Sequence, residues 1–476
     1  MTRYNQFIAG DWVAPTTNSW FEAVDPSTGE AFAELARGSH SDIDRAVSAA
    51  RMAFPAWAFR DALERGRILS RIAQRIIKDQ ETLARIESTD TGKPLSQARA
   101  DVLIAARYFE FYAGAVDKFG GSTIPIPGPF LDYTLREPLG VVASIIPWNY
   151  PLQIGSRAIA APLAVGNAVV VKPAEEASVS LFTLAAICAD EGVPSGVVNV
   201  ISGFGEEAGA PLAAHPDINH VTFIGSLKVG RLVAQAAARN VVPVTLELGG
   251  KSPHVVFSSA NLDRAVPIII RSFIQNAGQT CSAGSRILVD REIKPEFVER
   301  LAEGIGRVQI GPGWSDPDLG PLISERQRKR VQHYIDLAQN RGAQVHFGSD
   351  PSVGQGFFVP ATLLDAVQPD NPVFHEEIFG PVASVTEFSR ESEAVVLANG
   401  TEYGLVSAVW TRDIGQAHRV AKRLQTGQVF INSYGAGGGV EMPFGGYRHS
   451  GYGREKGMEA LYQYTQVKNV AVFMDE

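Results

Sequence analysis

Residues 141–248 carry five short apolar runs: VVASII (141–146), AVVV (168–171), VVNVI (197–201), HVTFI (220–224) and VTLEL (244–248). Helical patterns lie between several of these runs, as at 178–190 and 228–238. Near-continuous apolar strands that alternate with helices are typical of a parallel sheet covered on both faces. We therefore predict a doubly wound α/β domain, in which ligands bind at the carboxyl ends of the strands.

The flanking segments extend this pattern in both directions. Upstream, Ser41 with Asp44 three residues later matches a helix-capping pattern, and an amphipathic helix is expected around residues 68–76. The Gly- and Pro-rich segment FGGSTIPIPG (119–128) is typical of a hairpin or excursion. Downstream, a second α/β series runs over residues 251–446. The sequence thus predicts two α/β units and a smaller excursion.

The composition excludes several classes of function. The net charge is 43 − 51 = −8, which gives no electrostatic basis for binding nucleic acid. Pro147, Gly166 and Asn167 interrupt the longest apolar stretches well short of the roughly 20 residues that a membrane helix needs. The first 21 residues contain no apolar signal core. We expect a cytoplasmic protein that binds neither nucleic acid nor membrane.

The two cysteines, Cys188 and Cys281, are too few for a disulfide framework or a four-thiolate zinc site. Cys188 lies in an apolar helical pattern, where it is expected to be a small buried hydrophobic residue. Cys281 lies among small residues in NAGQTCSAGS (276–285), which leave room for a substrate at its sulfur. We expect no metal site, with His215 and His220 at the surface or at caps rather than acting as ligands.

Three glycine-containing turns were candidates for phosphate binding. FIGSLKVG (223–230) follows an apolar strand, and Ser226 can cap a helix whose free N–H groups favour an anion, although a plain strand-to-helix turn explains the pattern equally well. GFGEEAG (203–209) has GxGxxxG spacing, one residue longer than the dinucleotide fingerprint. GGKS (249–252) would need glycine where Thr245 stands, so the ATPase interpretation fails.

Polar residues stand at the ends of the apolar strands: Asn149 in PWNYP, Lys172 and Glu175 in VVKPAE, and Glu247 in LELGGK. Each of them alone is explained as well by a satisfied polar group at a strand end. Taken together with Cys281, these residues indicate a site more strongly than any one of them does alone. They would place a nucleophile, an amide, a cation and carboxylates at one edge of the sheets.

Seven motifs in order then point to a family: PWNYP (147–151), KPAE (172–175), FIGSLKVG (223–230), LELGGK (246–251), GQTCSAG (278–284), EEIFGPV (376–382) and PFGGYRHSGYGRE (443–455). In this order they resemble the motifs of the NAD(P)-dependent aldehyde dehydrogenase superfamily, over about residues 7–470. The resemblance implies a Rossmann-like doubly wound cofactor domain, an α/β catalytic domain and a small β oligomerisation element. Their expected bounds are 1–118 with 139–248, then 249–448, and finally 119–138 with 449–476.

The resemblance implies a catalytic set. Cys281 would be the nucleophile, and the Asn149 amide with the Cys281 N–H would form an oxyanion hole. Glu247 would be the general base that activates water, and Glu455 resembles a glutamate of the family's proton relay. Glu247 also speaks against the CoA-acylating branch, so a free carboxylic acid is the expected product.

The resemblance also implies NAD as the cofactor. Lys172 and Glu175 would hold the adenosine ribose, and the carboxylate of Glu175 would repel the 2′-phosphate of NADP. Glu377 would bind the nicotinamide ribose. The remaining expected cofactor contacts are Ile146, Pro147, Trp148, Gly205, Gly209, Gly225, Ser226, Leu248 and Phe379.

The substrate is less constrained by the sequence. The expected pocket residues are Tyr150, Gln153, Ile154, Arg157, Thr280, Ser282, Tyr434 and Val440. Arg157 is similar to an arginine of the succinate-semialdehyde branch, but Gln275 stands where that branch has a second arginine. An internal ion pair explains Arg157 equally well. The glycine-rich loop 433–440 leaves room for bulk, so we favour a medium-chain or aromatic aldehyde, with a carboxylated semialdehyde as the alternative.

Two further expectations concern the whole chain. Residues 119–138 and 464–473 should pair as strands and support a homodimer or homotetramer. A catalytically inactive relative kept as a structural protein is the alternative from another class. The presence of Cys281, Glu247 and Asn149 argues against that alternative.

Overall fold

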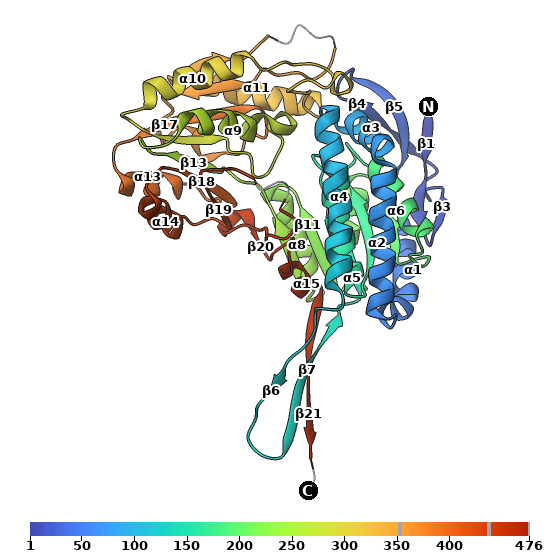
Figure 1. The fold of residues 1–476 in the computed structure, drawn as a ribbon. Helices are drawn as coiled ribbons and strands as arrows, with labels where there is room; N and C mark the ends of the chain where they lie inside the picture. The colour runs from blue at the N-terminus through green and yellow to red at the C-terminus, as the bar shows by residue number, and fades with distance from the viewer. Residues whose placement is uncertain (351–354, 436–438, 475–476) are drawn as a thin grey trace.

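A computed structural model describes residues 1–350, 355–435 and 439–474 (Figure 1). Within these residues the strands are β1 (Thr2–Tyr4), β2 (Gln6–Ile8), β3 (Asp11–Val13), β4 (Trp20–Asp25), β5 (Glu30–Ala36), β6 (Thr123–Ile124), β7 (Phe130–Pro138), β8 (Val141–Ile146), β9 (Ala168–Pro173), β10 (Val198–Val200), β11 (His220–Ile224), β12 (Val244–Glu247), β13 (Pro253–Val256), β14 (Arg286–Asp290), β15 (Gln344–Phe347), β16 (Thr362–Asp365), β17 (Val382–Phe388), β18 (Val406–Trp410), β19 (Gln428–Ile431), β20 (Gly451–Tyr452) and β21 (Thr465–Phe473).

The α-helices of the same residues are α1 (His40–Ala58), α2 (Ala62–Lys78), α3 (Gln80–Thr91), α4 (Leu95–Ala115), α5 (Pro151–Ala164), α6 (Val179–Asp190), α7 (Ala210–Ala214), α8 (Leu227–Ala238), α9 (Leu262–Ile274), α10 (Lys294–Gly306), α11 (Glu325–Asn340), α12 (Pro372–His375), α13 (Glu391–Ala398), α14 (Ile414–Arg423) and α15 (Glu459–Gln463).

The five apolar runs form the centre of one sheet, here called sheet I, in the order β20-β12-β11-β8-β9-β10-β2-β3. Strands β8 to β12 are mutually parallel. Counted along the chain, these five strands lie in the order 5-4-1-2-3, so the winding reverses between β8 and β11. Doubly wound folds bind ligands at such a reversal, beyond the carboxyl ends of the strands. The predicted Rossmann-like topology is confirmed.

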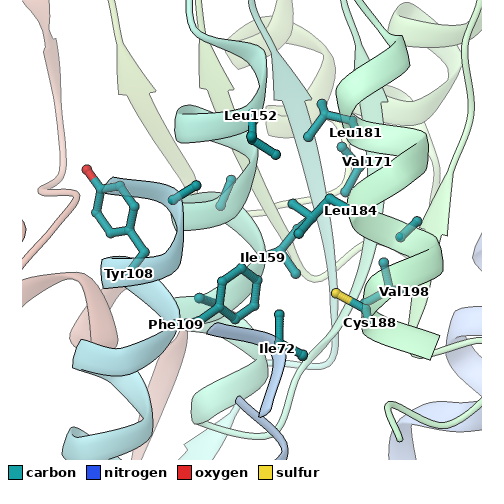
Figure 2. Close-up of a cluster of buried hydrophobic side chains, with 14 of the residues drawn as sticks. Ile72, Tyr108, Phe109, Leu152, Ile159, Val171, Leu181, Leu184, Cys188 and Val198 are labelled. Carbon is teal, nitrogen blue, oxygen red and sulfur yellow. The ribbon is translucent and has the colours of Figure 1, made fainter. Parts of the chain in front are cut away.

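Helices cover both faces of sheet I because its strands are apolar on both sides. Val142 and Val169 face a core built with α2 to α6, whereas Val141 and Val170 face a core built with α1, α7 and α8. Cys188 belongs to the first core and lies among aliphatic side chains of neighbouring helices and strands (Figure 2). Its predicted burial is therefore confirmed.

Helix α1 starts two residues earlier than the sequence pattern suggested. The capping box is formed by Ser39 and Asp42, not by Ser41 and Asp44. Both pairs have the same spacing, but Asp42 also accepts hydrogen bonds from the main-chain N and the hydroxyl of Thr16. This contact with a distant segment selects the first pair over the second.

The second α/β series forms sheet II, in the order β15-β16-β17-β14-β13-β18-β19. Neighbouring strands are parallel except for β15, which runs antiparallel to β16. Helices α9 to α11 pack on this sheet in a core of its own. Figure 1 shows this unit beside the helices of sheet I.

A third sheet, β21-β7-β6, projects from the body of the molecule (Figure 1). β21 pairs with β7 from Thr465 opposite Pro138 to Phe473 opposite Phe130, so the predicted pairing of these distant segments is confirmed. β20 lies in the same C-terminal segment but pairs with β12 of sheet I. The division of the chain into domains stays a prediction.

One expectation about a histidine was wrong. His220 is 2% exposed and lies within β11, where it contacts Thr245 at 3.2 Å. Burial lowers the pKa of His220 to about 3, so the ring is neutral. Among the described helices, none is long and apolar enough to cross a membrane. The same residues contain no group of three His, Cys, Asp or Glu side chains arranged for a metal ion.

Candidate active site

The turn before Cys281 has a strained backbone. Asn276, Ala277 and Gly278 have φ values of 50°, 53° and 71°, in the left-handed region that costs a non-glycine residue about 1 kcal/mol or more. A Cβ on Gly278 would lie 2.1 Å from the carbonyl oxygen of Gly380. Glycine is therefore required at this position, where the chain leaves α9 and approaches sheet II.

Asn149 lies just beyond β8 and is joined to this turn. Its Nδ2 donates to the Gln279 carbonyl oxygen at 2.8 Å, and its own carbonyl oxygen accepts from Asn276 Nδ2 at 2.8 Å. Asn149 is buried, and an amide nitrogen carries two N–H groups, so the second can donate elsewhere. The amide and the nucleophile predicted from the sequence thus lie in adjoining segments.

The thiol of Cys281 lies in an apolar environment. Cys281 packs against the buried cluster of Leu405, Val406 and Phe444. A Cβ on Gly250 would lie 2.6 Å from the Cys281 carbonyl oxygen, so the predicted LELGGK motif lies directly against the nucleophile segment. Burial, together with the negative charge of Glu247, raises the pKa of Cys281 to about 12. At neutral pH the Cys281 thiol is therefore protonated.

Glu247 ends β12 and is 2% exposed, and neither of its carboxylate oxygens has a hydrogen-bond partner. A Cβ on Gly445 would lie 2.8 Å from Glu247 Oε1, which shows how closely the chain packs around the carboxyl group. Burial raises the pKa of Glu247 well above its ordinary value, and the charge of Glu455 raises it further, while Arg157 acts against both. Such a carboxyl group holds its proton to a higher pH than an exposed glutamate does.

Arg157 and Glu455 form a buried ion pair. The guanidinium carbon also lies 5.6 Å from the ring centroid of Phe444. Burial raises the pKa of Glu455, and the charge of Arg157 counteracts that effect. Of the two explanations that the sequence left open for Arg157, the geometry favours the internal ion pair.

The residues predicted to bind the adenosine half of a dinucleotide lie at the carboxyl edge of sheet I. Lys172 Nζ, at the end of β9, donates to Glu175 Oε2 at 3.0 Å. A Cβ on Gly209 would lie 3.8 Å from Lys172 Cδ, whereas one on Gly205 would meet nothing within 4 Å. Ser226 caps α8, as predicted, and the N-terminus of this helix follows the end of β11.

The residues predicted at the nicotinamide half come from both sheets. Glu377 Oε1 accepts from Gly250 N at 3.1 Å, and a Cβ on Gly249 would lie 2.2 Å from Glu377 Oε2. Burial raises the pKa of Glu377 to about 7. The rings of Trp148 and Phe379 meet edge to face with centroids 5.3 Å apart. These contacts bring the EEIFGPV, LELGGK and PWNYP motifs together.

The other predicted cofactor residues have mainly packing contacts. Ile146 is buried at the end of β8, and Pro147 follows it with partial exposure. Gly225 donates its main-chain N–H to the Glu247 carbonyl oxygen at 3.0 Å. Leu248 is buried against α8, where a Cβ on Gly230 would approach its side chain to 2.6 Å.

Four predicted pocket residues meet in two pairs around Cys281. The Tyr150 hydroxyl lies 2.8 Å from Thr280 Oγ1, and the Tyr434 hydroxyl donates to the Ser282 carbonyl oxygen at 2.5 Å. Each pair joins one residue next to the cysteine with an aromatic residue from a different part of the chain. The two tyrosine hydroxyl groups therefore hold the segments on either side of Cys281.

The remaining pocket predictions are less well supported. Gln153 and Ile154 lie in the first turn of α5, and Ile154 is buried. Val440 is also buried, and its carbonyl oxygen accepts from Gly457 N at 2.8 Å. Within the glycine-rich loop 433–440, residues 436–438 lie outside the described residues.

Three residues at the site were missed from the sequence. Gln279 and Asn276 hold Asn149, and Lys93 donates to the Asn149 carbonyl oxygen at 3.1 Å. Lys93 is 1% exposed. A single lysine between two helical patterns is normally interpreted as a surface residue, so the sequence carried no signal for its burial.

Comparisons with known proteins identify the class to which this fold and site belong. The sequence model of the aldehyde dehydrogenase family matches residues 12–470. The chain therefore belongs to the aldehyde dehydrogenase family, as the seven motifs suggested, and is an oxidoreductase.

The individual relatives cover nearly the whole chain. The hydroxyisobutyraldehyde dehydrogenase of Mycolicibacterium austroafricanum is 43% identical over 98% of this chain and 94% of its own. The mitochondrial aldehyde dehydrogenase of Equus caballus is 42% identical over 98% and 95%. Betaine aldehyde dehydrogenase from Staphylococcus aureus, solved in complex with NAD⁺, has a TM-score of 0.96 at 36% identity, with 99% and 95% coverage.

Proposed function

We propose that the protein oxidises an aldehyde to the carboxylic acid with NAD, through covalent intermediates on Cys281. The proposal rests on the groups that the structure brings together where the two sheets meet. There the thiol, the Asn149 amide and an unpaired buried carboxyl group, Glu247, lie in contacting segments. These are the groups needed to form an acyl-enzyme and then hydrolyse it.

In the first step the sulfur of Cys281 attacks the aldehyde carbon and forms a thiohemiacetal. The raised pKa of the thiol means that its proton must leave as the attack proceeds, and the partly exposed cysteine can release it to water. The free N–H of Asn149 then donates to the developing oxyanion. A preorganised donor of this kind contributes about 3–4 kcal/mol.

The chain's residues at the carboxyl edge of sheet I fit NAD. Ser226 presents a helix N-terminus for the pyrophosphate, and Lys172 with Glu175 suits a ribose diol. Gly249 leaves the space in which Glu377 lies, at the expected nicotinamide end. NAD held by these residues would supply the hydride acceptor that oxidises the thiohemiacetal on Cys281 to a thioester.

Hydrolysis of the thioester requires a base. Glu247 is buried and has both oxygens free of hydrogen bonds within the protein, so it can bind and deprotonate a water molecule. Its raised pKa makes the carboxylate a stronger base than an exposed glutamate. The Arg157–Glu455 pair lies beside it and influences its charge.

Glu175 selects NAD over NADP in this proposal, because its carboxylate would face the position of a 2′-phosphate. Formation of NADH or NADPH, followed by absorbance with each cofactor in turn, tests this choice. We expect a higher kcat/KM with NAD, and a smaller ratio of the two values in Glu175→Ser. A higher value with NADP for the wild-type protein would reject the choice.

For the substrate, the site favours an uncharged medium-chain or aromatic aldehyde. Cys281 and Tyr434 pack against the same apolar cluster, which contains Phe444, and the guanidinium of Arg157 already has the partner Glu455. A substrate carboxylate would have to displace Glu455 from a buried pair. The hydroxyisobutyraldehyde dehydrogenase relative is also named for a small uncharged aldehyde.

Values of kcat/KM for benzaldehyde, hexanal, betaine aldehyde and succinate semialdehyde separate these substrate classes. We expect the first two to be preferred. A carboxylated semialdehyde remains the second candidate because Arg157 lies near the thiol. A preference for succinate semialdehyde that disappears in Arg157→Ala would establish that candidate, and failure of every aldehyde to yield NADH would indicate an inactive relative.

We also propose that the projecting sheet is the oligomerisation element of a homodimer or homotetramer. Leu131, Val472 and Phe473 expose 42–58% of their surface on it. Apolar side chains on an extended sheet are suited to contact with a second copy of the chain. The division into a cofactor domain and a catalytic domain follows the two sheets in this proposal.

A further inference from the structure

Lys93 lies in the loop between α3 and α4 and reaches the main chain next to β8. Its Nζ donates to Glu87 Oε1 at 3.2 Å, to Asp101 Oδ2 at 2.6 Å and to the Asn149 carbonyl oxygen at 3.1 Å. An ammonium group has three donors, and all three are used. The ring centroid of Tyr150 lies 4.4 Å from the same nitrogen. The ammonium group is therefore held in one position.

The charge of this group is retained in spite of its burial. Burial alone would lower the pKa of Lys93, but the charges of Asp101 and Glu87 outweigh that effect and raise it. A buried ion pair contributes little to stability compared with apolar packing of the same volume. Stability alone is therefore a weak reason for this cluster, and its third contact, to Asn149, is the one directed at the site.

The same carbonyl oxygen is held from the opposite direction. Asn276 Nδ2, in the turn before Cys281, donates to it at 2.8 Å. Both lone pairs of the Asn149 carbonyl oxygen are thus used, one by each donor. The side-chain Nδ2 of Asn149 is fixed in turn by the Gln279 carbonyl oxygen. The main chain and the amide of Asn149 are held between the Lys93 cluster and the nucleophile turn.

We propose that Lys93 is a positioning residue for the oxyanion hole: its ammonium group fixes the Asn149 peptide so that the free amide N–H points at the oxygen of the tetrahedral intermediate. This inference rests on the proposed function. Lys93 acts through Asn149 and does not touch the substrate. A misplacement of about 1 Å at such a donor lowers the rate by up to about 100-fold.

The test compares two reactions of the same thiol in the full-length protein. 4-Nitrophenyl acetate acylates Cys281 through a tetrahedral oxyanion, whereas iodoacetamide alkylates it by displacement without one. The test variant carries Lys93→Met, Glu87→Gln and Asp101→Asn together, so that no buried charge is left unpaired. The control is Asp101→Asn alone, which keeps Lys93 with Glu87 and Asn149.

We expect the acylation rate constant of the triple variant to be about 10–100-fold below that of the control, with alkylation changed by less than about twofold. When Asn149 is already replaced by alanine, adding the same three substitutions should lower the acylation rate constant by less than about twofold. The reason is that the Asn149 amide, through which Lys93 acts, is then absent. Equal losses in acylation and alkylation, or additive losses in the Asn149→Ala background, would overturn the proposal.

Folding is checked by thermal unfolding. If the triple variant does not fold, Lys93→Gln is measured instead, with the same ratio of acylation to alkylation as the readout. Wild-type NADH formation from aldehydes is recorded separately. Its absence would reject the proposed function, whereas normal wild-type turnover with an unchanged ratio in the variants would reject the role of Lys93 alone.

Discussion

Cys188 and Cys281 show how the surroundings determine what one type of side chain can do. Burial raises the pKa of each thiol to about 12. Cys188 is enclosed by aliphatic side chains, and burial is the sole cause of its shift (Figure 2). Cys281 has Glu247 and Arg157 among the charges that act on it. Because the two thiols have similar pKa values, we attribute the expected difference in their reactivity to the charged neighbours of Cys281.

Replacement of each cysteine separates these roles. Cys281→Ser should abolish NADH formation from aldehydes, because a serine hydroxyl is a far weaker nucleophile. Cys188→Ala should retain turnover and lose about 1–2 kcal/mol of unfolding free energy through the small cavity. Steady-state kinetics and denaturant unfolding measure the two effects. Loss of turnover in Cys188→Ala, with Cys281→Ser still active, would contradict the assignment.

Glu247 gives a prediction about pH. Because burial raises its pKa, the carboxylate forms at a higher pH than for an exposed glutamate, so deacylation should slow as pH falls through the raised pKa. Glu247→Gln should lose about 10²–10⁴-fold in kcat and this acid limb, while the first-turnover burst of NADH remains. Glu402→Gln, at an exposed glutamate, is the control. If the NADH burst of Glu247→Gln fell by the same factor as kcat, Glu247 would also act before hydrolysis, which would contradict this prediction.

At the scale of elements, the turn 275–278 connects α9 to the nucleophile segment. Gly278→Ala would place a Cβ against the Gly380 carbonyl oxygen and strain a positive φ, so both stability and kcat should fall. Gly342→Ala is the matched control: its φ is +88°, but a Cβ there meets nothing within 4 Å. It should lose about 1 kcal/mol of unfolding free energy and no activity. Thermal unfolding and kcat distinguish the two variants.

The elements that could be predicted from the sequence are those with local causes. The runs that became β8 to β12 are near-continuous apolar stretches, and Ser226 directly precedes a helical pattern. The choice of Ser39 over Ser41 depended on Thr16, which is distant in sequence. Lys93 is explained by the carboxylates and the carbonyl oxygen that surround it after folding. Such non-local contacts leave no periodic pattern in the sequence.

The roles of single site residues were inferred from motifs, and the geometry supports them unequally. Asn149 and Cys281 are joined through Gln279, which is a direct structural reason to treat them together. Arg157 is expected in the substrate pocket because it is similar to an arginine of the succinate-semialdehyde branch, but its partner Glu455 comes from a segment far away in the chain. A resemblance at one position cannot reveal such a partner.

At the scale of the whole molecule, the projecting sheet predicts assembly. Light scattering should give the mass of a dimer or tetramer for the wild-type protein. Leu131→Asp with Val472→Asp, which lie opposite each other on β7 and β21, should reduce this mass towards that of one chain. Val396→Asp, at an exposed apolar residue of α13, should leave it unchanged. A single-chain mass for the wild-type protein would contradict the proposed assembly.

The pairing of β20 with β12 has a consequence for biosynthesis. Glu247 lies opposite Gly451, so the edge of sheet I stays open while the whole of sheet II is being translated. A nascent chain at that stage exposes the edge of β12 and lacks Glu455, the partner of Arg157. Such open edges make incomplete chains prone to aggregation. Chains released before β20 has been made are therefore expected to aggregate more readily than the complete chain.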